Sequence, residues 1–309
     1  MTTTLDKDPA PAGPPAQAPK ISKAKATRLP GQRALVAQPS TWFVWAGIAF
    51  FFIILFGIIF GVLVDSFGKP WFSTWFPENF TTSWYTTAWE RFGLGQVIGV
   101  TLAVSLITVF VAVAIGVPAA YVLARKNFPG KKLLSLLFLL PIMIPPITYG
   151  IPLATVMYNV GLGRTLAAVI LVNLVPSVPF VIMTMTPFIE QINPSIENAA
   201  RMCGAGTKDL FLRILAPLLV PGMLAAAVLV LVRTVGMFEL TYLVSGPGSD
   251  TLVVAIYRAM TASGGGEARQ LVSSMGVVYT VTMMVILIVA LRFVNPTQLV
   301  AQVKDVSDD

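Results

Sequence analysis

Residues 196–207 read IENAARMCGAGT, a compact polar segment set between two long apolar runs. Asn193-Pro194, just before it, is a good N-cap and N1 pair, and Gly204 with Gly206 can end a helix that contains the alanine pair. Thr207 is then expected to cap a second helix that leads into the next apolar run. This pattern predicts two short helices that dock onto a partner, and an ordinary solvated loop helix is the alternative.

The composition of the whole chain is that of an integral membrane protein. Of its 309 residues, 56% are hydrophobic and 11% are charged, and the mean hydropathy is +0.79. The net charge of +7 comes from Lys and Arg at the ends of apolar runs, a distribution that signals membrane topology rather than nucleic-acid binding. The absence of histidine and the single Cys203 argue against imidazole metal sites and an intrachain disulfide. We therefore expect no metal site.

Six apolar runs are long enough to cross a bilayer about 30 Å thick as helices. They cover approximately residues 42–64, 97–123, 133–158, 166–189, 218–237 and 271–293. The third and fourth contain several prolines, which neighbouring helices in a bundle can accommodate. Small residues such as Gly95, Gly99 and Gly116 are expected to be close-packing contacts. The prediction is an all-α integral membrane protein with six transmembrane helices.

Lys and Arg in the short flanks of these runs indicate the orientation. The N-terminal tail, the loops 125–132 and 190–216, and the C-terminus are the more basic segments. Both termini should therefore lie in the cytoplasm, together with residues 196–207. We expect a disordered basic tail at 1–40, a transmembrane domain at 41–300 that includes the loop 190–217, and a short C-terminal tail at 301–309.

Two segments on the opposite side of the membrane are long for simple connectors. Residues 69–95 are rich in aromatic residues, which suits an external partner or the head-group layer. Residues 251–260 are apolar but too short to span, so we expect a re-entrant or interfacial segment there.

The sequence gives little support to catalysis by this chain. It lacks the phosphate-binding G-x-x-x-x-G-K-[ST] loop, a Rossmann fingerprint after a strand, and paired acidic residues within any span. The chain is therefore predicted not to be an enzyme.

Two ionisable residues are expected at membrane depth, Arg233 and Glu239, at the end of the fifth run. Such residues are costly there and suggest a pathway or gate, with interfacial snorkelling or helix pairing as the alternative. A mutual ion pair would need a break near Gly236. Uncharged polar residues at mid-span form a second candidate set, each as readily explained by helix–helix hydrogen bonds: Thr148, Tyr149, Asn173 and Ser177.

The polar segment resembles the EAA motif of permease subunits of binding-protein-dependent ABC importers, whose pattern is E-A-A, three residues, G, nine residues, I-x-L-P. Five positions match at the right spacing: Ala199, Ala200, Gly204, Ile214 and Pro217. Asn198 stands where glutamate is usual, with Glu197 just before it. We therefore expect Glu197 or Arg201 to make the partner contact. The similarity extends over about residues 75–300, including residues 121–125, 128–130 and 193–195.

This resemblance implies the type I importer permease fold, with a cytoplasmic coupling helix at the loop. The implied partners are a second permease subunit, expected to form a heterodimer, two cytoplasmic ATPase subunits and an extracytoplasmic solute-binding protein. ATP and Mg²⁺ would be bound by the ATPases and no cofactor by this chain. The implied location is the bacterial inner membrane. Some segments look like polyamine-type permeases and others like the sugar class, with a polyamine-like solute favoured.

A stand-alone channel or ion-coupled secondary transporter is the alternative function. It predicts inverted repeats with matching broken helices and a mid-span acid, and no convincing repeat relates the two halves of this sequence.

Overall fold

The computed structural model describes residues 39–71, 74, 76–262 and 266–293. These residues are almost entirely helical, and Gly68 and Phe80 form an isolated antiparallel bridge among them. The chain divides into two compact units, one ending at Leu55 and the other beginning at Phe56. The predicted tails at 1–40 and 301–309 lie almost wholly outside the described residues.

The helices follow the predicted apolar runs closely. Five are long and apolar enough to cross a membrane, and a bent pair of helices can supply a sixth span. The helices are α1 (Pro39–Phe67), α2 (Ser83–Arg91), α3 (Leu94–Arg125), α4 (Lys131–Met143), α5 (Pro146–Asn159), α6 (Leu166–Gln191), α7 (Pro194–Met202), α8 (Thr207–Asp209), α9 (Ala216–Val235), α10 (Glu239–Val244), α11 (Leu252–Thr261) and α12 (Arg269–Phe293), with a π-helix, η1 (Leu210–Leu215), between α8 and α9.

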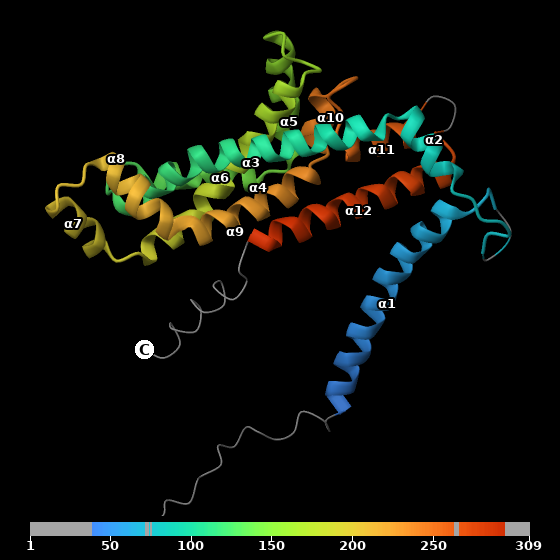
Figure 1. Cartoon of the computed structure of the whole chain (residues 1–309), viewed down its shortest axis with the longest axis horizontal. Coiled ribbons are helices and arrows are strands. Elements are labelled where there is room, and N and C mark those ends of the chain that lie inside the picture. The colour runs from blue at the N-terminus through green and yellow to red at the C-terminus, as the bar shows by residue number, and fades with distance from the viewer. Residues whose placement is uncertain (1–38, 72–73, 75, 263–265, 294–309) are drawn as a thin grey trace, which may run out of the picture. The chain divides into compact units, whose positions relative to one another are not determined.

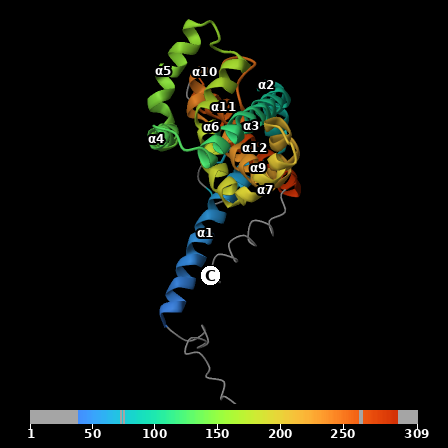
Figure 2. The ribbon, with the colours of Figure 1, turned by 90° about the vertical axis from the view of Figure 1, so that its left-hand side faces the viewer.

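The third predicted span is two helices rather than one. α4 and α5 meet at 97° (Figure 2). Pro145 and Pro146 stand at the junction, and Pro145 has no N–H to donate to the carbonyl of Pro141. The Tyr149 hydroxyl donates to that carbonyl instead, at 3.3 Å. The prolines therefore decide the bend, and a side chain from the next helix satisfies the acceptor that they leave free.

A bundle of α3, α6 and α9 holds the largest apolar core of the second unit. Its fully buried side chains include Met185 and Ile189 of α6 and Leu219 of α9. Figure 1 shows these three helices running side by side with α12, and their mutual packing is the most extensive in the chain. Gly116 of α3 allows the closest approach, because a Cβ there would lie 2.7 Å from Cγ1 of Val181.

The glycine expectation holds only in part. A Cβ at Gly95 would meet the Trp89 ring at 3.3 Å, so this glycine is also a packing position. Nothing lies within 4 Å of a Cβ built at Gly99, so the prediction of a close contact there is wrong for this chain. α3 has a face at Gly99 that no described residue of the chain covers closely.

At the end of the bundle where α3 and α12 begin, polar side chains tie the last turn of α1, which belongs to the second unit, to α12. Asp65, near the end of α1, accepts hydrogen bonds from Arg269 Nε at 3.1 Å and from Ser273 Oγ at 2.7 Å. The Arg269 guanidinium also lies 5.1 Å from the Trp71 ring centroid. α11 lies at this same end (Figure 1). It is an apolar helix too short to span, in agreement with the sequence-based expectation.

The second helix of the loop is continuous with the fifth span, over Thr207–Val235. Its N-cap is Gly206, without a side-chain hydrogen bond, so the prediction that Thr207 is the cap is wrong. η1 lies within this helix, and the N–H of Ala216 bonds to the carbonyl of Phe211. Pro217 is the next residue and has no N–H to donate to the carbonyl four residues before it. The π-helical turn therefore lies where one α-helical hydrogen bond is missing because of this proline.

Candidate functional site

α7 lies at the end of the bundle opposite to α2 (Figure 1). Asn193 Oδ1 accepts a hydrogen bond from the Ser195 N–H at 2.9 Å, and Pro194 occupies the first turn, as predicted. At the other end, Ala205 N–H bonds to the Ala200 carbonyl and Gly204 N–H to the Arg201 carbonyl. These two bonds, with φ of 84° at Gly204, form a Schellman motif that favours glycine there. The local sequence therefore determines both ends of α7.

The Glu197 carboxylate joins α7 to the end of α3. Its Oε1 lies 2.7 Å from Nε of Arg125, and its Oε2 accepts from the Tyr121 hydroxyl at 2.7 Å. The side chains of Arg125 and Glu197 are 12% and 8% exposed, and Arg125 also donates to the carbonyl of Ile192. A pair this buried is costly to break on one side, because the remaining charge is left unpaired.

This geometry gives Glu197 a role within the chain. The sequence suggests Glu197 or Arg201 as the partner contact, but the Glu197 carboxylate is occupied within the chain. Because neighbours on one helical face are three or four residues apart, Ala200 faces inward with Glu197 and packs on the main core. Asn198 and Ala199 are exposed, and Met202 is 88% exposed. Arg201, four residues after Glu197, is also exposed but interacts with the Tyr121 hydroxyl on the side that faces α3. The surface that α7 offers is therefore mixed, with Asn198 beside the apolar Ile196, Ala199 and Met202.

The remaining motif residues divide between packing and surface. Ile214 is half-buried and packs against the main core beside the fully buried Leu215. Pro217 is exposed. Arg213 is exposed and pairs with Asp209 at 3.4 Å. A residue that matches the EAA pattern is therefore not always available to a partner, because some of the matching residues pack inside the chain.

The mid-span polar residues do not form one group. Asn173 is buried and donates from Nδ2 to the Val169 carbonyl at 2.8 Å and to Thr241 Oγ1 at 3.2 Å. Ser177 is buried and donates to the carbonyl of Asn173 at 2.7 Å. These contacts support the helix–helix alternative for Asn173 and an intrahelical role for Ser177. Thr148 is exposed.

Arg233, Glu239 and Tyr149 lie near one another where α9 ends. The chain breaks between Val235 and Glu239, as an approach of the two charges requires, and both charges act on the Tyr149 side chain. Among the described residues neither charge forms an ion pair at 4.0 Å or less, and the Arg233 guanidinium lies 5.6 Å from the Phe180 ring centroid. These three residues form one group of the predicted pathway set, and Asn173 with Ser177, joined by a hydrogen bond, form another.

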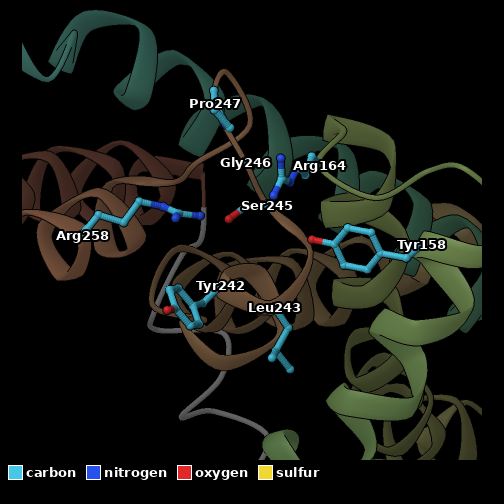
Figure 3. Close-up of a pocket in the computed structure, with 8 residues that line it drawn as sticks. All are labelled: Tyr158, Arg164, Tyr242, Leu243, Ser245, Gly246, Pro247 and Arg258. Carbon is cyan, nitrogen blue, oxygen red and sulfur yellow. The ribbon is translucent and has the colours of Figure 1, made fainter. Parts of the chain in front are cut away.

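Sequence reasoning missed a pocket at the end of the bundle remote from α7. Figure 3 shows it between the loop before α6 and the segment that joins α10 to α11, lined by Tyr158, Arg164, Tyr242, Leu243, Ser245, Gly246, Pro247 and Arg258. Its volume is about 450 Å³. The sequence Gly246-Pro247-Gly248 predicts a turn and was the one local indication of this pocket. Nothing in the sequence indicates that Arg164 lies next to that turn.

The fold and the position of α7 define the class of molecule: a multi-pass helical membrane protein that presents a capped helix at one end of its bundle. The chain belongs to the family described as the binding-protein-dependent transport system inner membrane component, whose model matches residues 112–298. α7 and the pocket both lie within the matched region. This family consists of the membrane permease components of ABC importers.

Curated relatives include permeases named for different solutes. The trehalose transport system permease protein SugB of Mycobacterium tuberculosis is 37% identical over 131 residues, 42% of this chain and 48% of that protein. The probable sulfate transport system permease protein cysT of Nephroselmis olivacea is 34% identical over 159 residues, 48% and 56%. The molybdenum transport system permease protein ModB of Escherichia coli is 31% identical over 192 residues, 56% and 84%. The chain spans about half the length of the first two relatives.

Solved structures agree with the predicted fold. A bacterial ABC transporter involved in the import of the acidic polysaccharide alginate matches with a TM-score of 0.67 at 16% identity, covering 84% of this chain and 99% of that chain. The MetNI methionine ABC transporter matches with a TM-score of 0.53 at 20% identity, covering 64% and 93%. The expectation of an all-helical type I importer permease fold is confirmed.

Proposed function

We propose that this chain forms part of the translocation pathway of an ATP-driven importer and that α7 is its coupling helix. The observation that supports this most directly is the division of α7 into two faces. One face is held to α3 through Glu197 and Arg125, and the other exposes Asn198, Ala199 and Met202. A short helix with one anchored and one free face suits insertion into a groove on a partner.

In this proposal α7 docks onto one of two cytoplasmic ATPase subunits, which bind and hydrolyse ATP with Mg²⁺. The chain itself is non-catalytic and pairs with a second permease subunit as a heterodimer. An extracytoplasmic binding protein delivers the solute. The complex lies in the bacterial inner membrane with α7 and both termini of this chain on the cytoplasmic side, as the distribution of Lys and Arg indicates.

Co-purification tests the coupling proposal. The complex solubilised in mild detergent is expected to retain an ATPase subunit, and Met202→Glu is expected to lower the retained fraction at least severalfold because it places a charge on a side chain that is 88% exposed on the free face of α7. Lys69→Glu, a charge reversal remote from α7, should leave retention unchanged. Complete loss of the ATPase from the unsubstituted complex would favour a stand-alone channel or secondary transporter.

The solute that we propose is of the sugar or polyol class. The sequence alone favours a polyamine-like solute, but polyamines require carboxylates that are free to bind cations. Glu239 lies near a positive charge, since it and Arg233 both act on Tyr149, and two arginines line the pocket at the other end of the bundle from α7. The trehalose permease relative is consistent with this choice.

Glu239→Gln separates the two solute classes. For a sugar or polyol, uptake is expected to change less than about twofold, because the lost charge is not a ligand. For a polyamine, loss of a carboxylate partner removes a charge-assisted interaction and should lower uptake at least about tenfold. Uptake of radiolabelled trehalose and spermidine by cells that express the complete transporter measures both. A loss confined to spermidine uptake would overturn the sugar or polyol proposal.

A further inference from the structure

The pocket at the end of the bundle remote from α7 contains polar groups whose hydrogen-bonding capacity the chain leaves unused. Ser245 is 4% exposed, and its Oγ has no hydrogen-bond partner within the described structure. Figure 3 shows this oxygen directed into the pocket on the side of Arg258, while the Tyr158 hydroxyl points inward from the opposite wall. A buried hydroxyl without a partner is costly, so a ligand that accepts from it would be stabilised there.

Arg164 is held at the pocket by an unusual backbone conformation. Its φ is 64°, the one positive value among the described residues other than glycine. Its N–H donates to the Val244 carbonyl at 2.8 Å, and its carbonyl accepts from Ser249 Oγ at 3.1 Å. Gly246 lets the side-chain stem lie against the backbone, since a Cβ there would be 2.7 Å from Cβ of Arg164. Such strain is retained where surrounding contacts enforce it, and it marks functional positions.

The pocket has an excess of positive charge. Arg258 pairs with Asp250 at 2.9 Å and lies 5.6 Å from the Tyr242 ring centroid. Among the described residues Arg164 has no acidic partner within 4.0 Å. The exposed Arg164 thus brings one guanidinium charge without an acidic partner to the same cavity that Ser245 lines. The cavity has a volume of about 450 Å³, which is within the range of small-molecule sites.

We propose that this pocket binds one oxyanionic group, a carboxylate or a sulfate or phosphate ester, of a small solute at the outer mouth of the pathway. The inference rests on the proposed function and narrows the solute to a sugar or polyol that bears a single anionic group. Arg164 supplies the charge, and Ser245 donates a hydrogen bond from a fixed position. Arg258, neutralised by Asp250, forms the opposite wall.

Inorganic sulfate is the probe that tests the site. The complete transporter is placed in nanodiscs of phosphatidylcholine, and sulfate is titrated calorimetrically against a chloride background of equal ionic strength. Saturable binding is expected. Ser245→Ala should weaken it about fivefold, and Arg164→Gln at least about tenfold, because hydrogen bonds to a charged group are stronger than neutral ones. Arg213→Gln, an exposed arginine beside α7, is the matched control and should bind sulfate normally.

Three results would overturn the proposal. The first is no saturable sulfate binding by the unsubstituted transporter. The second is sulfate binding by both pocket variants that equals binding by the unsubstituted transporter. The third is loss of sulfate binding when phosphatidylglycerol is added, which would make the pocket a lipid headgroup site. Ser245→Ala removes a single oxygen atom and should leave the loop conformation unchanged. Its effect on sulfate binding therefore still tests the site if Arg164→Gln disturbs the strained loop. Retention of the ATPase is scored separately in each preparation, and its loss would count against the proposed function alone.

Discussion

Glu197→Ala is expected to raise the ratio of detached to docked α7 about a hundredfold and thereby to lower binding-protein-stimulated ATP hydrolysis by the reconstituted importer. The substitution leaves Arg125 buried without its partner, and breaking one side of a buried pair costs about 3 kcal/mol. Since 1.4 kcal/mol corresponds to a factor of ten, α7 would leave its position on α3 in a correspondingly larger fraction of molecules. Movements of the ATPase subunits would then no longer be transmitted through α7 to the helix bundle.

Two variants make this test specific. Exchanging the charges, with Glu197→Arg and Arg125→Glu in one chain, should recover a substantial part of the activity. Asp209→Ala breaks an exposed pair within one helix, which contributes little, and should change activity less than about twofold. Cys203, the only cysteine of the chain, is exposed at the end of α7, so its maleimide labelling rate reports on the loop directly. Full activity in Glu197→Ala would show that the contact with α3 does not transmit coupling.

Gly116→Ala should destabilise the transporter by about 2 kcal/mol, the typical cost of overpacking a filled core. The added Cβ would lie 2.7 Å from Cγ1 of Val181 and 3.4 Å from the Val178 carbonyl oxygen. Val181 is fully buried and has no free space to move into. For a protein of this size such a loss lowers the melting temperature by about 5 °C, which a thermal unfolding assay in detergent measures.

Gly99→Ala on the same helix is the matched control. No atom lies within 4 Å of a Cβ at Gly99, and alanine is the better helix former by about 1 kcal/mol. This variant should be as stable as the parent or slightly more stable. Equal destabilisation by the two substitutions would mean that the effect comes from the helix α3 itself and not from its contact with α6.

The sequence alone was sufficient for features that depend on neighbouring residues. Apolar runs of spanning length predicted the long helices, because a bilayer requires each span to satisfy its own backbone hydrogen bonds. Asn193, Pro194 and Gly204 predicted both ends of α7, because capping acts within one helical turn. The prolines of the third run were visible in the sequence, but not that they divide it into two helices at 97°, because neighbouring helices can also accommodate prolines within one span.

Tertiary structure decided the features that join distant parts of the chain. Glu197 meets Arg125 across 72 positions, and Ser249 meets Arg164 across 85. Local pattern could not show that the Glu197 carboxylate is occupied by its own chain, or that a strained arginine and an unpartnered serine share one pocket. The physical reason is that periodicity and capping report on one helix at a time, whereas the direction and pairing of a polar side chain depend on which helices the apolar core brings together.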